Sequence, residues 1–425
     1  NKILYHQVFK YIKNNKLNYT KWYNMKNNKT NRKRHKKQIK NNNQKVIISF
    51  SEEMLTGNSG NVLMGRFIEG LGLKGMLDTG LKIERGINTT YSTTEMIMIF
   101  LESVFIGAKR YSQIGMLRND LVLREIEGYR KFPVMSTITR FFHKTKNSNS
   151  IELSNIECKL RDKVWHKRPM KEVTLDIDST VKGVYGNHEG VKKGYNPKKH
   201  GQKSYHPLLC YVAETRECLH NWLRSGDCYT GNGSVDFIRE ALEKLPNSVE
   251  KITVRADSGF FDEKLLLELE NRGINYVIKV KLKNLKDLLI KQNYREVKLP
   301  NKTDKNIISK IYVTNFEHKC AEWKEGRHFV VVKVLKKDTP KEKNNEIKLG
   351  KEDLLFKLEQ EEEYEYYCFV TNIAREEISI WELYKERGEC ENLIENTKNQ
   401  MYAGDYLLDN YWANDFSFSL CVLAY

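Results

Sequence analysis

The chain has 425 residues, enough for two or three domains, and 40% of them are hydrophobic, which excludes a mainly disordered protein. Only 7 prolines and 25 glycines are present, which excludes a collagen-like or linker composition. The formal net charge of +17 is unevenly distributed. Residues 1–45 contain 14 Lys or Arg and no acidic residue, so the rest of the chain carries only +3.

The basic segment is the first predicted element. We expect residues 1–45 to form a basic, Asn/Lys-rich arm that neutralises DNA phosphates, with Tyr19, Trp22 and Tyr23 able to stack on bases. The alternative is a solvated, disordered tail of a Lys- and Asn-rich protein, because blocks of like charge often remain unfolded.

Membrane and disulfide signals are missing from the sequence. No apolar run approaches the roughly 18 residues of a membrane span, and the N-terminus lacks the apolar segment of a signal peptide. The eight cysteines are dispersed and include no C-x2-C pair, which favours reduced thiols over a disulfide framework or a zinc site. We therefore expect a soluble, cytoplasmic protein with no membrane partner.

Helical periodicity dominates residues 46–170. Asn61–Gly70 is amphipathic, Ser92 is a candidate cap for a helix over Thr93–Tyr111, and Ser136–Phe142 has apolar residues at helical spacing. These patterns predict an all-helical domain.

From Val173 the period changes to that of strands, and strands then alternate with helices. This order predicts an α/β layer in which helices cover a mixed sheet. The predicted elements are strands Val173–Asp178, His206–Val212 and Glu217–Leu223, helix Ser234–Leu245, strand Lys251–Ala256, helix Asp262–Asn271 and strand Asn275–Val280.

Residues 285–365 are strand-like again, which predicts an inserted β-rich module. Its strands are Ile307–Val313 and His328–Leu335, and charged loops follow the second. Residues 366–425 then begin with strand Tyr366–Asn372 and continue with one long helix from Ser379 to about Met401.

Two aspartates stand where strands end. Asp178 ends one predicted strand, and Asp257 follows another, in front of Gly259, which allows a sharp turn. Polar groups at strand ends of α/β sheets tend to converge, although either aspartate alone is more often a capping or turn residue. Asp176 lies on the same strand face as Asp178 and is the residue that could be mistaken for it.

The long predicted helix carries Tyr384, Arg387, Glu391 and Lys398 on one stripe. The alternative to a functional stripe is a solvated face in which Arg387 pairs with Glu391 one turn away.

A second basic cluster lies before the strand at His206. It contains Lys198, Lys199, His200 and Lys203. Because no paired cysteines accompany the histidines, we favour a phosphate-facing loop over a zinc site, and a purely solvated loop is the alternative.

Together these features resemble the DDE transposases of bacterial insertion sequences, in the branch whose ribonuclease-H-like fold contains an insertion. The resemblance rests on the two strand-end aspartates, the β-rich insertion after the second, and the pattern Y-x2-R-x3-E-x6-K on the next helix. The segments Gly194–Leu209 and Val254–Phe260 are also similar to the group 1 DDE domain. The resemblance covers about residues 50–425.

The resemblance implies an α/β fold: a ribonuclease-H-like catalytic core, with a β-rich insertion and a preceding all-helical N-terminal domain. The core would comprise residues 171–284 and 366–425, the insertion residues 285–365, and the DNA-end-binding helical domain residues 46–170. Because the family normally continues with further helices, we expect residues 366–425 to be a truncated last part.

The resemblance also implies that Asp178, Asp257 and Glu391 are catalytic, and that Tyr384, Arg387 and Lys398 contact phosphates. Three ionised carboxylates repel one another unless cations join them, and hard oxygen ligands select Mg²⁺ or Mn²⁺. Two such ions per site would support in-line phosphoryl transfer without a covalent enzyme intermediate.

The expected function is metal-dependent cleavage and strand transfer of insertion-sequence ends, by cut-and-paste through hairpin ends. The expected partners are double-stranded DNA, as terminal inverted repeats and target, and a second copy of the chain, in a bacterial nucleoid-associated setting. Two alternatives stay open: a catalytically silent DNA-binding protein of transposase descent, and a ribonuclease-H-like nuclease without strand transfer.

Overall fold

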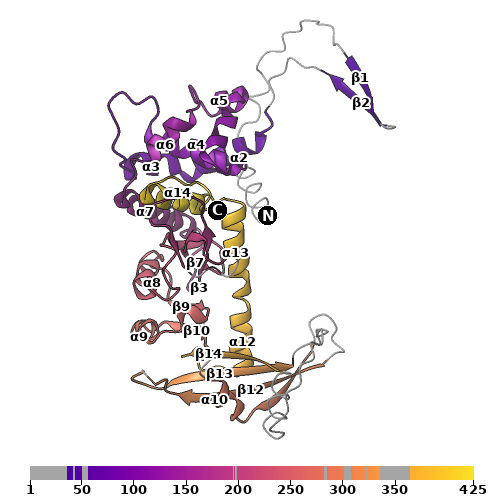
Figure 1. The fold of residues 1–425 in the computed structure, drawn as a ribbon, viewed down its shortest axis with the longest axis vertical. Helices are drawn as coiled ribbons and strands as arrows, with labels where there is room; N and C mark the ends of the chain where they lie inside the picture. Colours follow the sequence, from indigo (N-terminus) through magenta and orange to yellow (C-terminus); the bar gives the residue numbers. More distant parts are fainter. Residues whose placement is uncertain are drawn as a thin grey trace.

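The computed structural model describes residues 36–41, 44–49, 56–194, 196, 199–281, 285–300, 308–321, 323–335 and 364–425. They form a group of helices at one end of the molecule and a large sheet towards the other (Figure 1). Within these ranges no helix combines the length and the apolar character that a membrane crossing requires. All eight cysteines lie in these ranges, each as a free thiol.

A strand pair precedes the helices. β1 (Lys36–Asn41) and β2 (Gln44–Ser49) are antiparallel, so this hairpin lies across the expected boundary between the basic arm and the helical domain. Residues 1–35 of the expected arm lie outside the described residues.

The helical body is built mainly from the N-terminal half of the chain, but one C-terminal helix completes it. α14 packs against α4, α6 and α7, beneath the N-terminal helices in Figure 1. The elements of the helical body are α2 (Ser59–Leu71), α3 (Leu73–Gly80), α4 (Thr93–Phe105), η2 (Tyr111–Asn119), α5 (Leu121–Ile126), α6 (Met135–Phe142), α7 (Asn147–Trp165) and α14 (Tyr411–Ala424).

α4 is the centre of the helical body. The Ser92 hydroxyl accepts from the Glu95 backbone while the Glu95 carboxylate accepts from the Ser92 backbone, which confirms the predicted cap. Every residue from Met96 to Val104 is buried. The helix ends at Phe105 rather than at Tyr111, because Gly107 adopts a φ of +92°, which no right-handed helix allows.

The sheet has nine strands in the order β11-β12-β13-β14-β10-β9-β3-β7-β8. β3 is antiparallel to β7 and parallel to β9, and β9 is parallel to β10. Three antiparallel strands followed by two parallel strands with helical crossovers form the expected ribonuclease-H-like core. Its elements are β3 (Glu172–Ser179), β7 (Leu208–Val212), β8 (Cys218–Trp222), α8 (Ser234–Glu243), β9 (Lys251–Ala256), α9 (Glu263–Asn271) and β10 (Asn275–Lys279).

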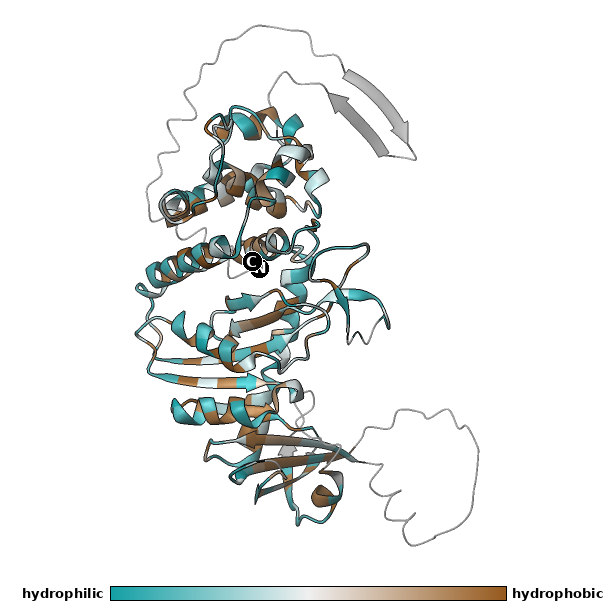
Figure 2. Ribbon diagram, turned by 60° about the vertical axis from the view of Figure 1, so that its left-hand side comes forward, coloured by the Kyte–Doolittle hydropathy of each residue, from teal (hydrophilic) through white to brown (hydrophobic). Residues whose placement is uncertain are grey.

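The predicted β-rich insertion extends this sheet instead of forming one of its own. β14 pairs with β10 on one side and with β13 on the other, and β11, β12 and β13 continue outward as a meander. Figure 2 shows these strands mainly in brown, in keeping with the buried valines of β13. Their bounds are β11 (Arg295–Pro300), β12 (Ile308–His318), β13 (Arg327–Leu335) and β14 (Tyr364–Thr371), with α10 (Lys286–Ile290) before them.

The predicted single helix from Ser379 to Met401 is wrong in one respect, because it is divided into two. α12 (Glu377–Lys385) and α13 (Gly388–Asn399) follow each other end to end in Figure 1. At the junction the Arg387 amide donates to Tyr384 O at 3.0 Å, an i→i−3 bond in place of the α-helical i→i−4 bond. This tighter turn leaves the carbonyl of Leu383 free for another donor.

Candidate active site

Two strand exits meet at one edge of the sheet. Asp178 is the penultimate residue of β3, and Asp257 directly follows β9 and accepts a hydrogen bond from Gly259 N at 2.9 Å. β3 and β9 are parallel neighbours, with Ile177 opposite Ala256. The two aspartates therefore leave the sheet side by side, which is what places them in one pocket.

The pocket at this edge has a volume of about 410 Å³. The third predicted carboxylate, Glu391, reaches it from α13. The lining residues are Asp178, Asp257, Ser258, Lys279, Tyr367, Trp381, Tyr384, Lys385, Arg387, Gly388 and Glu391.

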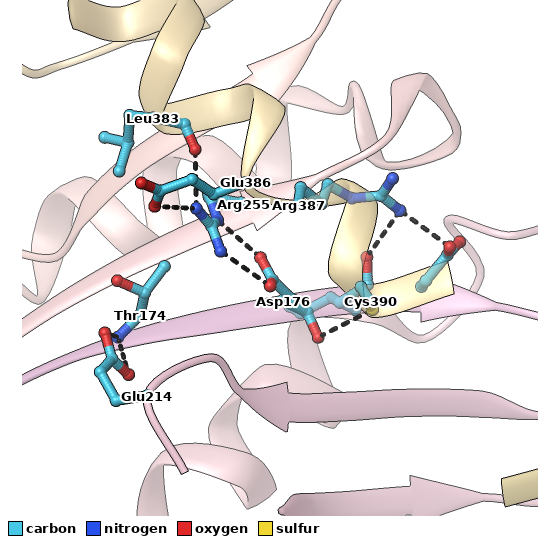
Figure 3. Close-up of polar contacts among 10 residues, drawn as sticks. Thr174, Asp176, Glu214, Arg255, Leu383, Glu386, Arg387 and Cys390 are labelled. Carbon is cyan, nitrogen blue, oxygen red and sulfur yellow. Dashed lines mark hydrogen bonds and ion pairs between the residues drawn. The ribbon is translucent and has the colours of Figure 1, made fainter. Parts of the chain in front are cut away.

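Asp176 and Asp178 have clearly different surroundings in the structure. Asp176 is 1% exposed and accepts two hydrogen bonds from Arg255, at 2.7 and 2.9 Å (Figure 3). Asp178 lies two residues nearer the strand exit and lines the pocket. Because the carboxylate of Asp176 is buried away from this opening, Asp178 is the member of the pair that can meet a ligand.

Arg387 is the pocket cation that pairs with Asp178. Its Nη2 lies 2.9 Å from Asp178 Oδ2 and donates to Ile177 O at 3.4 Å, whereas its buried Nε donates to none of the described residues. Burial raises the pKa of Asp178 to about 6, and the neighbouring Asp257 and Glu391 add to this while Arg387 opposes it. Burial alone would lower the pKa of Arg387, but the charge of Asp178 raises it, so Arg387 stays charged.

Tyr384 supplies a neutral hydroxyl. Its ring packs on Phe369 with a centroid distance of 4.6 Å. Burial raises the pKa of Tyr384 to about 12, so the phenol keeps its proton at neutral pH.

Lys398 does not line the pocket. Its Nζ donates to Thr180 Oγ1 at 2.8 Å and to Val181 O at 3.3 Å, in the segment that follows Asp178. The predicted stripe is therefore split: Tyr384, Arg387 and Glu391 face the pocket, whereas Lys398 reaches the chain beside it.

The second basic cluster also lies outside the pocket lining. Lys199 donates to Tyr185 OH at 3.0 Å, Lys203 donates to Asn187 Oδ1 at 2.7 Å, and His200 is exposed. Lys198 is outside the described residues. Lys199, His200 and Lys203 are part of a flap formed by the small sheet β4 (Lys182–Gly183), β6 (Lys203–Tyr205) and β5 (Lys192–Lys193).

His206 links the flap to the pocket edge. Its Nε2 is 3.1 Å from the hydroxyl of Ser179, the neighbour of Asp178, and its Nδ1 is 2.6 Å from Cys228 O. Burial lowers the pKa of His206, which favours the neutral ring at physiological pH.

Four cationic or aromatic residues of the pocket were missed by the sequence prediction. Lys385 Nζ lies 3.1 Å from the ring centroid of Trp381, and Lys279 Nζ lies 5.8 Å from that of Tyr367. Trp381 could have been found, because it lies one turn before Tyr384, and Lys385 could have been found, because it lies one turn after Trp381. Lys279 ends β10, so the strand-exit argument that selected Asp257 applies to it as well.

The carboxylates fit a hard cation by their chemistry. Three acidic side chains line the pocket, and Asp178 accepts from Ser179 N and Arg387 with lone pairs to spare. Among the described residues, no group of three acidic, His or Cys side chains is already close enough to hold a metal ion. The donor set therefore suits Mg²⁺ or Mn²⁺, while the arrangement is not a preformed cage.

Similarity to this chain is found among solved structures and in one family model. No curated protein matches it. Among solved structures, the synaptic complex of piggyBac transposase with hairpin DNA has 11% identity and a TM-score of 0.42, covering 87% of this chain and 73% of that one. The Mos1 transposase paired-end complex with the left transposon end has 11% identity and a TM-score of 0.19, covering 53% and 68%.

The family comparison is more specific. The family model described as "Transposase DDE domain group 1" matches residues 38–425, which includes the helical body, the sheet and the helices α12, α13 and α14. The chain belongs to the group 1 DDE transposase family.

Proposed function

We propose that the protein cuts and joins DNA at the ends of an insertion sequence, with Asp178, Asp257 and Glu391 as its catalytic carboxylates. One observation carries this proposal: two neighbouring strand exits and a distant helix deliver three carboxylates to one pocket beside Arg387. Phosphoryl transfer on DNA needs this combination of acidic and cationic groups.

The same three carboxylates would hold Mg²⁺ or Mn²⁺, two ions in our proposal. When bound, the ions would activate a water or a 3′-hydroxyl and stabilise the leaving oxygen in an in-line displacement. Carboxylate oxygens from three side chains in one pocket are the ligands that hard divalent cations prefer.

Arg387 and Tyr384 are proposed to bind the scissile phosphate. Arg387 lines the pocket while it pairs with Asp178, and a guanidinium can serve a carboxylate and a phosphate oxygen at once. Tyr384 donates from a protonated hydroxyl. Trp381 and Lys385 extend the pocket with a ring and a charge suited to bases and phosphates.

For the second strand we propose a hairpin. The freed 3′-hydroxyl attacks a phosphate of the opposite strand, a new 3′-oxygen–phosphorus bond closes the element end, and the flank leaves with its own 3′-hydroxyl. Water then opens the hairpin. We expect Arg387→Ala and Lys398→Ala to reduce hairpin formation more than first-strand nicking, because a hairpin crowds phosphates; denaturing gels separate these products.

We also propose that two copies of the chain hold two element ends, and that the flap contacts DNA away from the cleaved bond. Lys198, Lys199, His200 and Lys203 would neutralise phosphates there. Lys199→Ala/Lys203→Ala should weaken binding to all duplexes alike. The slope of the logarithm of the binding constant against the logarithm of salt concentration should flatten by about 0.9 for each phosphate that is no longer neutralised.

The decisive experiment is cleavage of duplex DNA that carries the sequences flanking the coding region, with Mg²⁺ or Mn²⁺. Glu391→Gln should lower the cleavage rate by about a thousandfold or more while DNA binding persists, because several kcal/mol of transition-state stabilisation depend on the metal ligands. Glu389→Gln is the matched control, because Glu389 is exposed on the same helix.

Three outcomes would contradict the proposal. Binding without cleavage by the wild-type protein would indicate a silent DNA-binding protein, and cleavage without joining would indicate a nuclease. Equal cleavage by Glu391→Gln and Glu389→Gln would show that Glu391 holds no essential ion.

A further inference from the structure

Arg255 forms a buried hub between the two strands that carry the pocket aspartates and the helices that carry Arg387 and Glu391. Its Nε and Nη2 donate to the two carboxylate oxygens of Asp176, and both side chains are no more than 2% exposed. Its Nη1 donates to Leu383 O at 2.6 Å and to Glu386 Oε2 at 3.2 Å. Figure 3 shows Arg255 between Asp176 and the junction of α12 and α13.

The first consequence concerns strand register. Asp176 lies opposite Arg255 in the parallel pair β3–β9, two residues before Asp178 and two before Asp257. A slip of β9 by two residues would keep the apolar side chains on their faces, but it would move Asp257 by about 7 Å along β3. The buried ion pair opposes this slip, because a displaced Arg255 would leave the carboxylate of Asp176 buried without a partner.

The second consequence concerns the helix junction. In a continuous α-helix the Arg387 amide would donate to Leu383 O. Here it donates to Tyr384 O, and Leu383 O accepts from Arg255 instead. The i→i−3 turn winds the chain by about 120° per residue rather than about 100°, so it sets the direction in which α13 presents Glu391.

Further contacts fix α13 on β3 just beyond this junction. Arg387 Nη2 donates to Ile177 O, and Cys390 Sγ lies 4.0 Å from Asp176 O. The junction is therefore held on the same two strands whose exits carry the aspartates.

We propose that the Asp176–Arg255 pair is a positioning unit. It fixes the register of β3 against β9 and the direction of α13, and so holds the carboxylates of Asp178, Asp257 and Glu391 in one pocket. The inference rests on the proposed function of these three carboxylates. Asp176 and Arg255 are positioning residues, because neither lines the pocket and each acts through the main chain that it holds.

A purely stabilising role is the competing explanation. Apolar residues of similar volume often replace a buried ion pair without loss of stability, so the two roles can be separated by experiment. The chain offers a matched control in Arg327, which is 6% exposed and donates to the Glu270 carboxylate at 2.8 and 3.0 Å, with neither residue lining the pocket.

The test compares Asp176→Leu/Arg255→Met with Glu270→Leu/Arg327→Met in the full chain. We expect the first double variant to bind DNA and unfold thermally like the wild type, yet to cleave about 100-fold more slowly, because small misplacements of reacting groups have effects of that size. Mn²⁺ binding, followed by electron paramagnetic resonance, should weaken, and amide hydrogen exchange over residues 383–391 should accelerate. The control variant should show none of these changes.

Wild-type cleavage and exchange in the first variant would overturn the inference, as would equal losses in the control. Should the first variant fail to fold, Arg255→Lys decides: its ammonium keeps the charge but cannot reproduce the guanidinium fork, so accelerated exchange is expected and wild-type exchange overturns the inference. Absence of cleavage by the wild-type protein would refute the proposed function instead. The exchange experiment would still test whether the Asp176–Arg255 pair holds residues 383–391 in place.

Discussion

The helical body and the sheet each bury a carboxyl group at 1% exposure, and they stabilise it in different ways. Glu102 on α4 accepts a hydrogen bond from Tyr129 OH at 2.6 Å, and burial raises the pKa of Glu102 to about 8. Asp176 on β3 accepts two hydrogen bonds from the charged Arg255. The helical body thus contains a neutral acid, and the sheet contains an ion pair.

The difference between a neutral acid and an ion pair follows from the number of elements that each group joins. A protonated carboxyl and a phenol join α4 to one neighbouring segment through a single neutral hydrogen bond. Arg255 reaches a second strand and a helix junction at the same time, which a neutral side chain with fewer donors cannot do. We infer that charge is buried where several elements must be held together. Substitutions at Glu102 and Asp176 and at their partners test this inference.

The largest expected effect is on the sheet. Arg255→Met leaves Asp176 buried without its cation and should lower the free energy of unfolding by about 3–5 kcal/mol. Urea unfolding measures the loss. Asp176→Leu/Arg255→Met should recover most of it, and a double variant as unstable as the single one would contradict the ion-pair explanation.

The next effect is a pH dependence in the helical body. Between the ordinary glutamate pKa of about 4.3 and the folded value of about 8, the folded state binds one proton more than the unfolded state at Glu102, so wild-type stability falls as pH rises through this window. The charged neighbours Lys74 and Glu127 remain in any variant of Glu102.

Glu102→Gln removes that titration and keeps an acceptor for Tyr129. We expect this variant to be more stable than the wild type by on the order of 3 kcal/mol at pH 7, with little difference near pH 4. Urea unfolding at both pH values tests this. Glu125→Gln, at an exposed position of α5, should leave the wild-type pH dependence intact.

A smaller effect is expected at the pocket. Arg387→Met removes the cation beside Asp178, whose side chain is 14% exposed compared with 1% for Asp176. Because water reaches Asp178 from the pocket, we expect a loss of about 1–3 kcal/mol, less than for Arg255→Met. Thermal unfolding with and without Mg²⁺ measures this loss. A loss equal to that of Arg255→Met would contradict the claim that the more deeply buried ion pair contributes more to stability.

The smallest effect is on the neutral pair. Tyr129→Phe removes one hydrogen bond to an uncharged Glu102 and should cost about 1 kcal/mol at pH 6. A loss as large as that of Arg255→Met would mean that Glu102 is ionised in the folded protein, contrary to the comparison.

The amino-acid sequence alone predicted what local pattern controls. The strand Lys251–Ala256 and the cap at Ser92 follow from residue periodicity and capping chemistry over a few positions, and the structure confirms both. The motif residues Asp178, Asp257 and Glu391 were selected from strand ends and helical spacing, and all three line one pocket. Family membership was visible in the sequence for the same reason, because the motif is a set of local spacings.

Only the tertiary structure decided the features that depend on distant contacts. Asp176 and Arg255 are 79 residues apart, and Arg255 and Glu386 are 131 apart, so no local pattern could show that Asp176 is held in a buried ion pair or divide the predicted helix at Arg387. The same holds for α14, which joins helices formed more than 200 residues earlier, and for β11–β13, which continue the core sheet. A side chain's partner is set by which segments pack together, and that packing follows from burial over the whole chain.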